Sequence, residues 1–495
     1  MSLSLLLDMA ASGHPDRIAL GTRADGVTFE RLARDAAGGA AVLRGHDARH
    51  VVFVGRNGPC FPQLLFASAI AGIPFVPLNY RLSAGQLQEM IAELDQPLLV
   101  ADEQYFPPLT EGHRAISVPS FLAESEAAAP LEAAPPDDDD PAVLLFTSGT
   151  TARPKAVVLK HEHLIAYILS TVEFGGADPD EASLVAVPPY HIAAVGSALS
   201  NLYAGRRVVY LPDFDPEGWL RLVREESVTT AMVVPTMLAR VLEVLGDRPA
   251  DAPALRLISY GGARMPQPVL ERALLAFDQA GFCNAYGLTE TSSTIALLGP
   301  DEHREALAAD DEAVRRRLGS VGRPVPGIEV QIRTDDGAVA AAGTSGELWV
   351  RGAQVSGEYR GHGSALDADG WLDTRDRGRL DADGYLYVEG RGDDTIIRGG
   401  ENIAPAEIED VLLRHPAVKD VAVLGQPDEE WGEKIVAVVV REASADVDAE
   451  SLRAFVRGRL RGSRTPDEIV WRAELPQTAT GKLLRRELRA ELSRR

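Results

Sequence analysis

Cysteine is scarce in this chain, where Cys60 and Cys283 are the only two among 495 residues. They lie far apart in the sequence and form no metal-binding motif, and two thiols do not make a disulfide framework. The sequence therefore argues against a disulfide scaffold and against a zinc site. Two partly buried thiols are the simplest interpretation of this pair.

Long apolar runs and an excess of positive charge are missing as well. Residues 2–8 lack a basic region and are too short for a signal peptide or a membrane span, and no other apolar run approaches membrane length. Fifty basic against 73 acidic side chains give a net charge of −23. We therefore expect a cytoplasmic protein without a membrane span and without general affinity for nucleic acid or anionic membranes. An anionic ligand would need local positive groups in order to bind.

What remains is typical of a multidomain α/β protein. A chain of 495 residues is too long for one hydrophobic core, and its apolar content of 45% is ordinary. From residue 141 to about residue 300, apolar strands alternate with helices, and an earlier block repeats this order. The alternation predicts βαβ units around a largely parallel sheet. The expected strands are 51–54, 75–78, 184–187, 207–211, 230–234 and 255–259, and the expected helices are 61–71, 191–204, 215–226 and 237–245.

The later part of the chain has a different pattern. Glycines separate short strands at 329–332, 347–350 and 385–388, which predicts a β-rich subdomain. Beyond a boundary near residue 391, helices at 406–414 and 451–461 and strands at 420–424 and 434–440 predict a small α+β domain. The fold class is therefore α/β, with a large N-terminal domain (1–391) and a small C-terminal domain (392–495). Residues 135–141, four aspartates flanked by prolines, are interpreted as a solvated linker without a metal role.

A hydroxyl-rich loop with a central glycine joins two apolar strands expected at 143–146 and 156–159. Backbone N–H groups and hydroxyls in so short a loop form a donor surface suited to a polyphosphate, and Lys155 adds a positive charge. It is not a Walker A loop, because the Gly-Lys-Ser/Thr ending and the following helix are missing. An ordinary hairpin is the alternative for this stretch alone. The loop reads Thr147-Ser148-Gly149-Thr150-Thr151-Ala152-Arg153-Pro154-Lys155.

Further motifs follow in a fixed order along the chain. Together with the loop, they resemble the adenylate-forming superfamily of acyl-CoA synthetases, nonribosomal-peptide adenylation domains and luciferases, and most closely the acyl-CoA synthetases. The resemblance covers nearly the whole chain and implies a mobile C-terminal lid hinged at Asp393. The motifs are Tyr286-Gly287-Leu288-Thr289-Glu290, Gly346-Glu347-Leu348, Thr374-Arg375-Asp376, Gly390-Arg391-Gly392-Asp393-Asp394, Gly399-Gly400-Glu401-Asn402-Ile403 and Pro476-Gln477-Thr478-Ala479-Thr480-Gly481-Lys482.

The resemblance implies a site for ATP and Mg²⁺. Glu290 corresponds to the Mg²⁺ ligand, Thr289 to a phosphate contact and Tyr286 to a residue that stacks on adenine. Asp376 and Arg391 match residues that bind ribose hydroxyls, and a carboxylate suits this task because it accepts two hydrogen bonds. The ATP-binding residues implied in this way are Thr147, Ser148, Gly149, Thr150, Thr151, Lys155, Gly261, Gly262, Ala263, Asn284, Ala285, Tyr286, Gly287, Thr289, Asp376 and Arg391.

Two C-terminal motifs are implied to act in the two halves of the reaction. Lys482 matches the family's catalytic lysine, and an ammonium brought to the α-phosphate would stabilise charge as it develops during attack. Gly399 and Gly400 are implied to lie beside the tunnel through which coenzyme A enters.

The expected helix at 191–204 is implied to line an acyl pocket. His191, at its start, is a candidate catalytic residue that orients the substrate carboxylate or gates the route to it; a capping or core histidine is the alternative. Amino-acid adenylation domains usually carry an aspartate here, within Phe-Asp-x-Ser. Tyr190-His191-Ile192-Ala193 replaces that pattern and favours a simple carboxylic acid. The expected acyl-pocket residues are His191, Ala194, Val195, Gly196 and Gly262, although small residues also serve close helix packing.

Some features depart from the family pattern or stay ambiguous. Ala152 and Ala156 stand where glycine is usual, and Arg375 replaces the glycine of Thr-Gly-Asp; the added Cβ atoms restrict positive φ angles. His161-Glu162-His163 lacks the second histidine of His-Glu-x-x-His and is interpreted as a helix start. A basic cluster could attract the phosphates of coenzyme A or be a solvated helix face. Its members are Arg453, Arg457, Arg459, Arg461 and Arg464.

The sequence thus predicts an ATP- and Mg²⁺-dependent carboxylic acid–CoA ligase. It would form an acyl-adenylate from a fatty or bulky hydrophobic acid, and the thiol of coenzyme A would then displace AMP. An enzyme that loads a separate acyl carrier protein is one alternative, and a non-catalytic nucleotide-binding sensor is another. The presence of Glu290, Asp376, Arg391 and Lys482 argues against the sensor.

Overall fold

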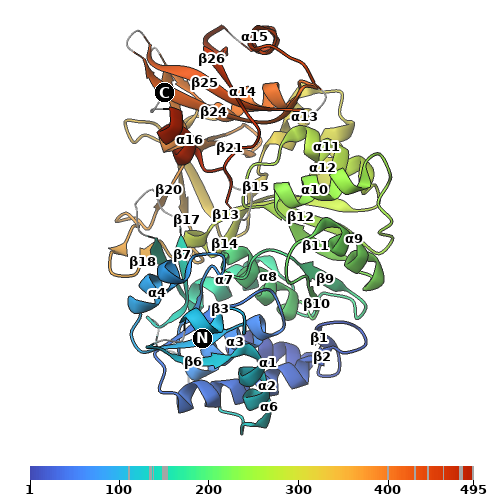
Figure 1. The fold of residues 1–495 in the computed structure, drawn as a ribbon, viewed down its shortest axis with the longest axis vertical. Helices are drawn as coiled ribbons and strands as arrows, with labels where there is room; N and C mark the ends of the chain where they lie inside the picture. Colours follow the sequence, from blue (N-terminus) through green and yellow to red (C-terminus); the bar gives the residue numbers. More distant parts are fainter. Residues whose placement is uncertain are drawn as a thin grey trace.

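The structure is a computed structural model. It describes residues 1–109, 112–132, 137, 139–147, 154–398, 401–428, 431–442, 445–460, 462–478 and 483–492. Within them, a large N-terminal domain and a small C-terminal domain of α/β architecture follow one another along the long axis of the molecule (Figure 1). The predicted fold class is confirmed.

The larger of two α/β sheets has nine strands in the described residues. Its central strands, from β13 to β1, are parallel, while β14, β15 and β2 join antiparallel at the two edges. The order is β15 (Arg323–Pro324), β14 (Ser293–Leu298), β13 (Gly281–Leu288), β12 (Leu257–Gly261), β11 (Thr230–Val233), β9 (Ala182–Val185), β10 (Arg207–Tyr210), β1 (Ile18–Leu20) and β2 (Val27–Thr28).

The second α/β sheet has eight strands in the described part of the chain. Strands β7, β4, β3, β5 and β6 are parallel, and β8, β18 and β19 continue the sheet in antiparallel pairs. The order is β19 (Gly363–Ser364), β18 (Glu358–Tyr359), β8 (Lys155–Lys160), β7 (Pro141–Thr147), β4 (Phe75–Pro77), β3 (His50–Val54), β5 (Pro97–Ala101) and β6 (Arg114–Ser117).

Helices cover these two sheets, and their starts follow from local sequence. Thr28 and Asp215 accept hydrogen bonds from the first-turn amides of α2 and α9, as N-cap residues do. All twelve residues of α3 are buried, so this helix is enclosed on every side. The helices are α1 (Ser4–Gly13), α2 (Phe29–Gly45), α3 (Cys60–Ala71), α4 (Ala84–Ala92), α5 (Phe106–Leu109), α6 (Val118–Ala127), α7 (His161–Thr171), α8 (Ile192–Tyr203), α9 (Pro216–Glu225), α10 (Pro235–Leu245), α11 (Gln267–Ala276), α12 (Pro300–Ala308) and α13 (Glu312–Arg315).

The predicted β-rich subdomain is an antiparallel sheet with its own apolar core around Leu348 and Val350. Its strands are β16 (Glu329–Arg333), β17 (Gly346–Arg351), β20 (Leu372–Leu380) and β21 (Leu386–Arg391). The C-terminal domain packs α14 (Pro405–Leu413), α15 (Ala449–Arg457) and α16 (Arg485–Leu492) against one more sheet. The strands of that sheet are β22 (Ile396–Arg398), β23 (Glu401–Ile403), β24 (Val418–Asp428), β25 (Gly432–Arg441) and β26 (Glu468–Arg472).

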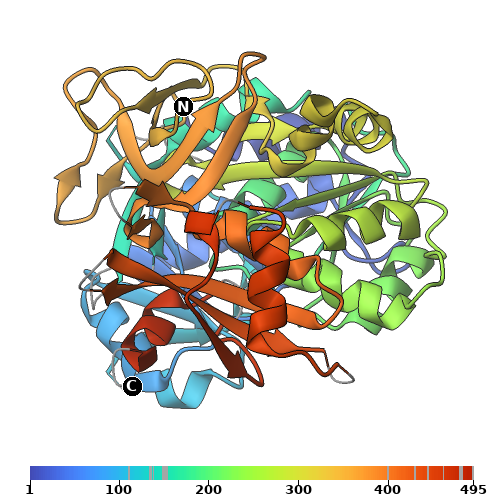
Figure 2. The ribbon, with the colours of Figure 1, turned by 90° about the horizontal axis from the view of Figure 1, so that it is seen from above.

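Seen from above, the C-terminal domain lies over the region where the other three sheets meet (Figure 2). Its α14 contacts the N-terminal domain through two polar pairs: Arg264 with Asp410, and Gln267 with Arg414, whose Nη2 donates over 2.6 Å.

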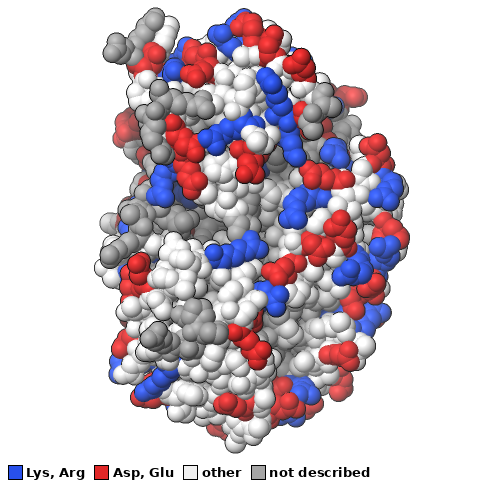
Figure 3. Space-filling model, viewed as in Figure 1, with Lys and Arg blue, Asp and Glu red and all other residues white. Residues whose placement is uncertain are grey.

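On the face shown in Figure 3, acidic and basic side chains are interspersed. None of the described helices is both long enough and apolar enough to span a membrane.

Most expected elements are present, with shifts of a few residues at their ends. The strand expected at 184–187 ends at Val185, and the carbonyl of Val187 instead accepts a hydrogen bond from Asn57 Nδ2 (2.9 Å). The helix expected to reach residue 461 ends at Arg457, before Gly458, which has low helix propensity. The strand expected at 255–259 begins at Leu257 and continues through Gly261.

The close contact between α2 and α6 depends on a glycine. A Cβ at Gly38 of α2 would lie 2.0 Å from the carbonyl oxygen of Ser125 in α6, whereas a Cβ at Gly45 in the same helix would meet nothing within 4 Å. We expect Gly38→Ala to lower the free energy of unfolding by about 1–3 kcal/mol through overpacking.

Gly45→Ala is the matched control, because the same change at an exposed helical position should stabilise by up to about 1 kcal/mol. Urea unfolding of both variants measures the difference. Equal effects of the two substitutions would contradict the close packing of α2 on α6.

Candidate active site

The predicted phosphate loop joins two neighbouring antiparallel strands. Thr147 ends β7, Lys155 begins β8, and the two are register partners, with Thr147 Oγ1 donating to the Lys155 carbonyl over 3.4 Å. The predicted strands on both sides are therefore confirmed. Ser148, Gly149, Thr150 and Thr151 lie outside the described residues, and their phosphate-binding role stays a prediction.

Glu290 lies in a short 3₁₀ turn, η1 (Thr289–Thr291), between β13 and β14. The reversal is sharp: a Cβ at Gly287 would lie 1.7 Å from the Ser293 carbonyl oxygen, and Ser292 and Ser293 have φ angles of 55° and 122°. Positive φ is costly for residues other than glycine and is concentrated at functional sites. The turn therefore fixes the position of the Glu290 backbone.

The Glu290 side chain meets a residue that sequence analysis missed. Tyr359 of β18 donates from its hydroxyl to Glu290 Oε1 over 2.8 Å, and the Lys155 ammonium lies 5.8 Å from the centre of the Tyr359 ring. Burial, followed by the charge of Glu290, raises the pKa of Tyr359, so the hydroxyl stays a donor at neutral pH. No local motif marks this tyrosine, because only strand pairing brings it to the site.

The residues around Glu290 fit a magnesium ion. Mg²⁺ prefers oxygen ligands and is commonly held by one or two carboxylates together with water and substrate phosphates. Glu290 forms no ion pair with a described lysine or arginine, so its charge is available, and the described residues contain no cluster of three His, Cys, Asp or Glu that would suit another metal. Glu290 would hold Mg²⁺ and the phosphates would complete its coordination.

Asp376, Arg391 and Tyr286 form one cluster. Asp376 is 6% exposed; its Oδ1 lies 3.2 Å from Arg391 Nε, and its Oδ2 accepts from the Tyr286 hydroxyl over 2.5 Å. Burial and the neighbouring Asp376 carboxylate raise the pKa of Tyr286. Asp376 is therefore a buried carboxylate with a partner on each oxygen. A buried carboxylate beside a tyrosine ring suits binding of a nucleoside. The carboxylate can accept hydrogen bonds from the ribose hydroxyls, and the ring can stack on the base.

The two glycines at the end of β12, Gly261 and Gly262, have different structural roles. A Cβ at Gly261 would lie 2.3 Å from the Ala285 carbonyl oxygen, so this glycine permits close pairing with β13, a structural need that the sequence interpretation overlooked. Gly262 has a φ angle of 77° and is exposed. Ala263 follows it, and Asn284 donates from Nδ2 to the Ser320 carbonyl over 3.1 Å. Gly261 and Gly262 thus end β12 in a turn at the carboxyl edge of the sheet.

His191 stands at the N-cap position of α8 without capping it through its side chain, and it is partly exposed. The ring of Tyr190 lies 4.6 Å away, centre to centre. Ala194 and Val195 are buried, and a Cβ at Gly196 would lie 3.1 Å from Ser293 Oγ. Close packing of α8 on the turn after Glu290 accounts for Gly196. The acyl-pocket role of these residues stays a prediction.

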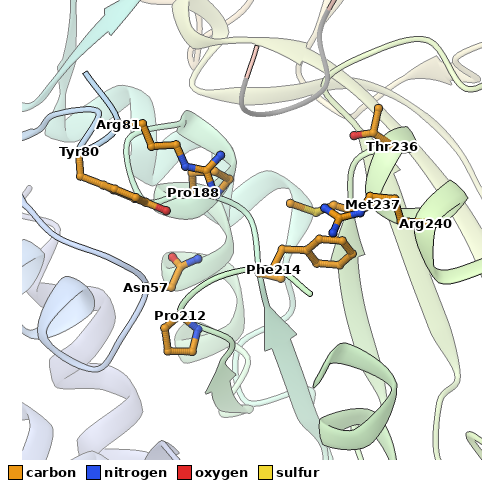
Figure 4. Close-up of a pocket in the computed structure, with 10 residues that line it drawn as sticks. Asn57, Tyr80, Arg81, Pro188, Pro212, Phe214, Thr236, Met237 and Arg240 are labelled. Atoms are coloured by element: carbon orange, nitrogen blue, oxygen red, sulfur yellow. The ribbon is translucent and has the colours of Figure 1, made fainter. Parts of the chain in front are cut away.

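A pocket opens at the carboxyl ends of several parallel strands (Figure 4). Ligands of open α/β sheets bind at this edge. Two cations line it: Arg81, and Arg240, whose guanidinium lies 5.1 Å from the centre of the Phe214 ring. The lining residues come from the segments after β3, β4, β9 and β10 and from α10: Asn57, Tyr80, Arg81, Ala186, Pro188, Pro212, Phe214, Thr236, Met237 and Arg240.

Aromatic rings connect this pocket with His191. Tyr80 lines the pocket and meets Tyr190 edge-on at 5.8 Å, and Tyr190 in turn contacts His191. Sequence analysis missed these pocket residues, although they lie at or after the end of a predicted strand or around the start of a predicted helix. Their position directly after parallel strands is the signal that could have found them.

The C-terminal predictions have mixed outcomes. Lys482, Gly399 and Gly400 lie outside the described residues. Asp393 lies in the 3₁₀ turn η3 (Gly392–Asp394), directly after β21. In the basic cluster, Arg464 pairs with Glu401 (2.6 Å) and Glu407 (3.2 Å), and Arg453 and Arg457 both pair with Glu450. These ion pairs favour the interpretation as a solvated face.

His161 begins α7, as predicted, and is buried. Its Nδ1 accepts from the backbone N–H of Leu3 over 3.1 Å, and burial lowers its pKa to about 4. The histidine therefore anchors the N-terminal segment to the core through a hydrogen bond.

The exposed Asp139 of the acidic linker pairs with Lys160 over 2.8 Å.

Comparison with known protein families gives two matches that together span most of the chain. Residues 7–360 match the AMP-binding enzyme family, and residues 407–482 match the AMP-binding enzyme C-terminal domain. The chain belongs to the AMP-binding enzyme family. The resemblance found in the sequence motifs is confirmed.

Similar proteins cover nearly the same length. A feruloyl-CoA synthase of an Amycolatopsis species is 34% identical over 94% of this chain and 93% of its own. A fatty acid–[acyl-carrier-protein] ligase of Streptomyces coeruleorubidus is 32% identical over 94% and 91%. The o-succinylbenzoate CoA synthetase of Bacillus subtilis, solved with its acyl-adenylate intermediate, superimposes with a TM-score of 0.85 at 31% identity over 98% and 97%. The same enzyme with ATP and magnesium ion gives a TM-score of 0.83 at 30% identity over 98% of both chains.

Arg375, which replaces the glycine of the family motif, adopts the backbone that glycine favours. Its φ angle is 60°, in a bulge where residues 374–376 of β20 lie opposite Leu348 of β17. Asp373 Oδ1 accepts from its backbone N–H over 2.7 Å and stabilises this conformation. The AMP-binding enzyme thus keeps the bulge that positions Asp376 despite the added side chain.

The positive φ angle of Arg375 predicts that the usual order of stability between alanine and glycine variants is reversed at this position. At ordinary strand positions, glycine is less stable than alanine by roughly 0.5–1 kcal/mol. At Arg375 the left-handed backbone penalises any Cβ by about 1–2 kcal/mol, so we expect Arg375→Gly to be more stable than Arg375→Ala. Arg377→Gly and Arg377→Ala are the matched pair in the same strand and should show the ordinary order. Chemical denaturation of the four variants checks this, and an ordinary order at residue 375 would contradict the strained backbone.

Proposed function

We propose that this enzyme is an ATP- and Mg²⁺-dependent ligase that joins a carboxylic acid to coenzyme A through an acyl-adenylate. One observation carries the proposal: Lys155 and Glu290 meet at Tyr359, while Tyr286, on the strand that leads to Glu290, holds Asp376. A phosphate-binding cation, a metal-binding carboxylate and a nucleoside-binding carboxylate are the groups that adenylation requires. Their arrangement supports ATP as a substrate.

In the first half-reaction the acid carboxylate attacks the α-phosphate, forming a C–O–P bond and releasing pyrophosphate. The developing negative charge must be stabilised by positioned donors and cations. Lys155 and the hydroxyl-rich loop would bind the departing phosphates, and Asp376 with Arg391 would orient the ribose. When bound, Mg²⁺ neutralises phosphate charge. Lys482 would contact the α-phosphate and the acyl oxygen.

In the second half-reaction the thiol of coenzyme A loses its proton to solvent and its sulfur forms a C–S bond with the acyl carbon, while AMP leaves with the electrons of the C–O bond. The pocket lined by Arg81 and Arg240 suits this acceptor, because two guanidinium groups attract phosphates in an otherwise acidic protein. The ring contacts from Tyr80 through Tyr190 lead toward His191, where the acid would lie.

For the acid, we propose a bulky apolar molecule. The names of the similar proteins include feruloyl, o-succinylbenzoate and fatty acyl substrates, which share a carboxylate attached to a sizeable carbon skeleton. His191, at the start of α8 and partly exposed, would orient this carboxylate. Because one similar protein is a ligase for an acyl carrier protein, a carrier thiol is the second candidate acceptor.

We further propose that residues 1–391 and 392–495 move relative to each other between the half-reactions, with Asp393 as the hinge. The turn η3 follows β21 directly, and Arg391 at the end of β21 contacts Asp376. A hinge at this position would leave the ribose contacts intact while the C-terminal domain rotates.

Separate assays of the half-reactions test the function. Pyrophosphate release that depends on the acid, measured across aryl, fatty and polycyclic acids, tests adenylation and rejects the sensor alternative. Formation of a thioester with coenzyme A, compared with a purified carrier protein, distinguishes the two acceptors. Failure of every acid to stimulate pyrophosphate release would reject the proposal.

We expect Lys482→Ala to slow acyl-adenylate formation by about 10²–10³-fold, because one electrostatic donor at the reacting phosphate is lost. Thioester formation from supplied acyl-adenylate should change little. Lys434→Ala is the control in the same domain, since Lys434 pairs with Glu468 on the surface of the sheet. An unchanged rate of pyrophosphate release in Lys482→Ala would reject the catalytic assignment.

Asp393→Pro should affect the two half-reactions unequally. Proline fixes φ near −65° and removes an N–H, so a hinge that needs a large φ/ψ change would be blocked. We expect adenylation to be largely preserved and thioester formation to be strongly slowed. Asp393→Ala removes the carboxylate without fixing φ and is the control. If both steps fall equally in Asp393→Pro, residue 393 is not the hinge.

A further inference from the structure

The segment from Ser356 to Arg360 connects Glu290 with the phosphate-loop strand. Toward Glu290, the backbone N–H groups of Ser356 and Gly357 donate to the Glu290 carbonyl over 2.9 and 3.3 Å. Toward β8, the backbone N–H of Arg360 donates to the Ala156 carbonyl over 2.9 Å. One short segment therefore touches both halves of the proposed triphosphate site.

Tyr359 lies in the middle of this segment and contacts both charged groups with its side chain. Its backbone pairs with Val157 of β8, its hydroxyl donates to Glu290 Oε1 over 2.8 Å, and the Lys155 ammonium lies 5.8 Å from its ring centre. An ammonium over a tyrosine ring is attracted by the negative ring face. The ring and the hydroxyl thus hold a cation and an anion that belong to different sheets.

We propose that Tyr359 is a positioning residue that orients the Glu290 carboxylate toward the metal and the Lys155 ammonium toward the phosphates. The inference deepens the proposed function, on which it rests. A hydrogen bond to Oε1 fixes the rotation of the carboxylate, while no described side chain bonds to Oε2, which can face the metal. Hydrogen-bond partners of metal ligands typically change metal affinity by 10–100-fold.

Strand pairing makes this orientation independent of the ligand. Tyr359 is half-buried and held by β8 on one side and β19 on the other. The buried Ser356 hydroxyl also donates to the Val158 carbonyl, so the segment is fixed at both ends. A side chain on such a support loses little entropy when it holds a ligand group, which is how supporting residues preorganise a site.

The test compares full-length Tyr359→Phe with a matched tyrosine. Tyr385 also donates to a carboxylate, Glu302 Oε1 at 3.1 Å, and has two cations over its ring, Arg317 at 4.7 Å and Arg323 at 4.5 Å. None of these contacts involves Glu290. Mn²⁺ binding in the presence of ATP, measured by electron paramagnetic resonance, is the readout besides activity. We expect Tyr359→Phe to weaken Mn²⁺ binding by about 10-fold or more, and Tyr385→Phe to leave it unchanged.

Kinetics and a second substitution separate the two contacts. Tyr359→Phe keeps the ring, so it should raise the Mg²⁺ concentration needed for half-maximal pyrophosphate release more than it changes the KM for ATP. Tyr359→Leu removes the ring as well and should raise the KM for ATP in addition. In a Glu290→Gln background, Tyr359→Phe should have no further effect on Mn²⁺ binding, because the carboxylate that it orients is gone.

Each outcome has a defined meaning. Wild-type affinity for Mn²⁺ in Tyr359→Phe, or an equal loss in Tyr385→Phe, would overturn the positioning role and leave the proposed function standing. Absence of Mn²⁺–ATP binding in the wild-type enzyme would overturn the proposed function together with this inference. Thermal melting of each variant identifies unfolding, and if Tyr359→Phe does not fold, the same comparison with Tyr359→Trp decides.

Discussion

The proposed site depends on one backbone constraint, the reversal between β13 and β14 that carries Glu290. Gly287 has no room for a side chain against the Ser293 carbonyl, and Ser292 and Ser293 accept positive φ angles. The buried Thr291 hydroxyl accepts from the Leu288 N–H and donates within the turn, and Gln354 donates to the Thr291 carbonyl over 3.0 Å. The hydrogen bonds offset the strain, so the turn holds the carboxylate in one place without a ligand.

Charge is distributed so that an acidic protein can still bind polyanions. The chain carries a net charge of −23, yet cations lie at the edges of its α/β sheets: Lys155 after the phosphate loop, and Arg81 and Arg240 in the pocket. Arg391, at the end of β21 in the β-rich subdomain, adds a cation beside Asp376. Acidic residues elsewhere disfavour general binding of polyanions, while these cations give the proposed nucleotide site local positive charge. The same edge collects the ends of parallel strands, where α/β proteins bind ligands.

Sequence reasoning found what is local and missed what is tertiary. The strands around the phosphate loop followed from apolar runs, and the structure confirms them. Family motifs indicated Asp376 and Arg391 separately, and the structure adds that the two form an ion pair. Gly261 was expected among the ATP-binding residues, and this role stays a prediction. Its need in strand pairing was missed, because a glycine in a sequence does not reveal which backbone lies opposite. Tyr359 reaches Glu290 across 69 residues, a contact that no spacing in the sequence indicates.

The departure at Arg375 shows how the fold limits the effect of a substitution. The bulge is fixed on both sides of the residue: Thr374 donates from Oγ1 to the Leu348 carbonyl over 2.7 Å, and the Asp376 N–H donates back to Thr374 Oγ1 over 3.1 Å. Since these bonds involve neighbours and not residue 375 itself, an arginine can occupy the left-handed position while Asp376 keeps its place. Its conformational cost is borne by the stability of the domain and does not displace the carboxylate that contacts Tyr286.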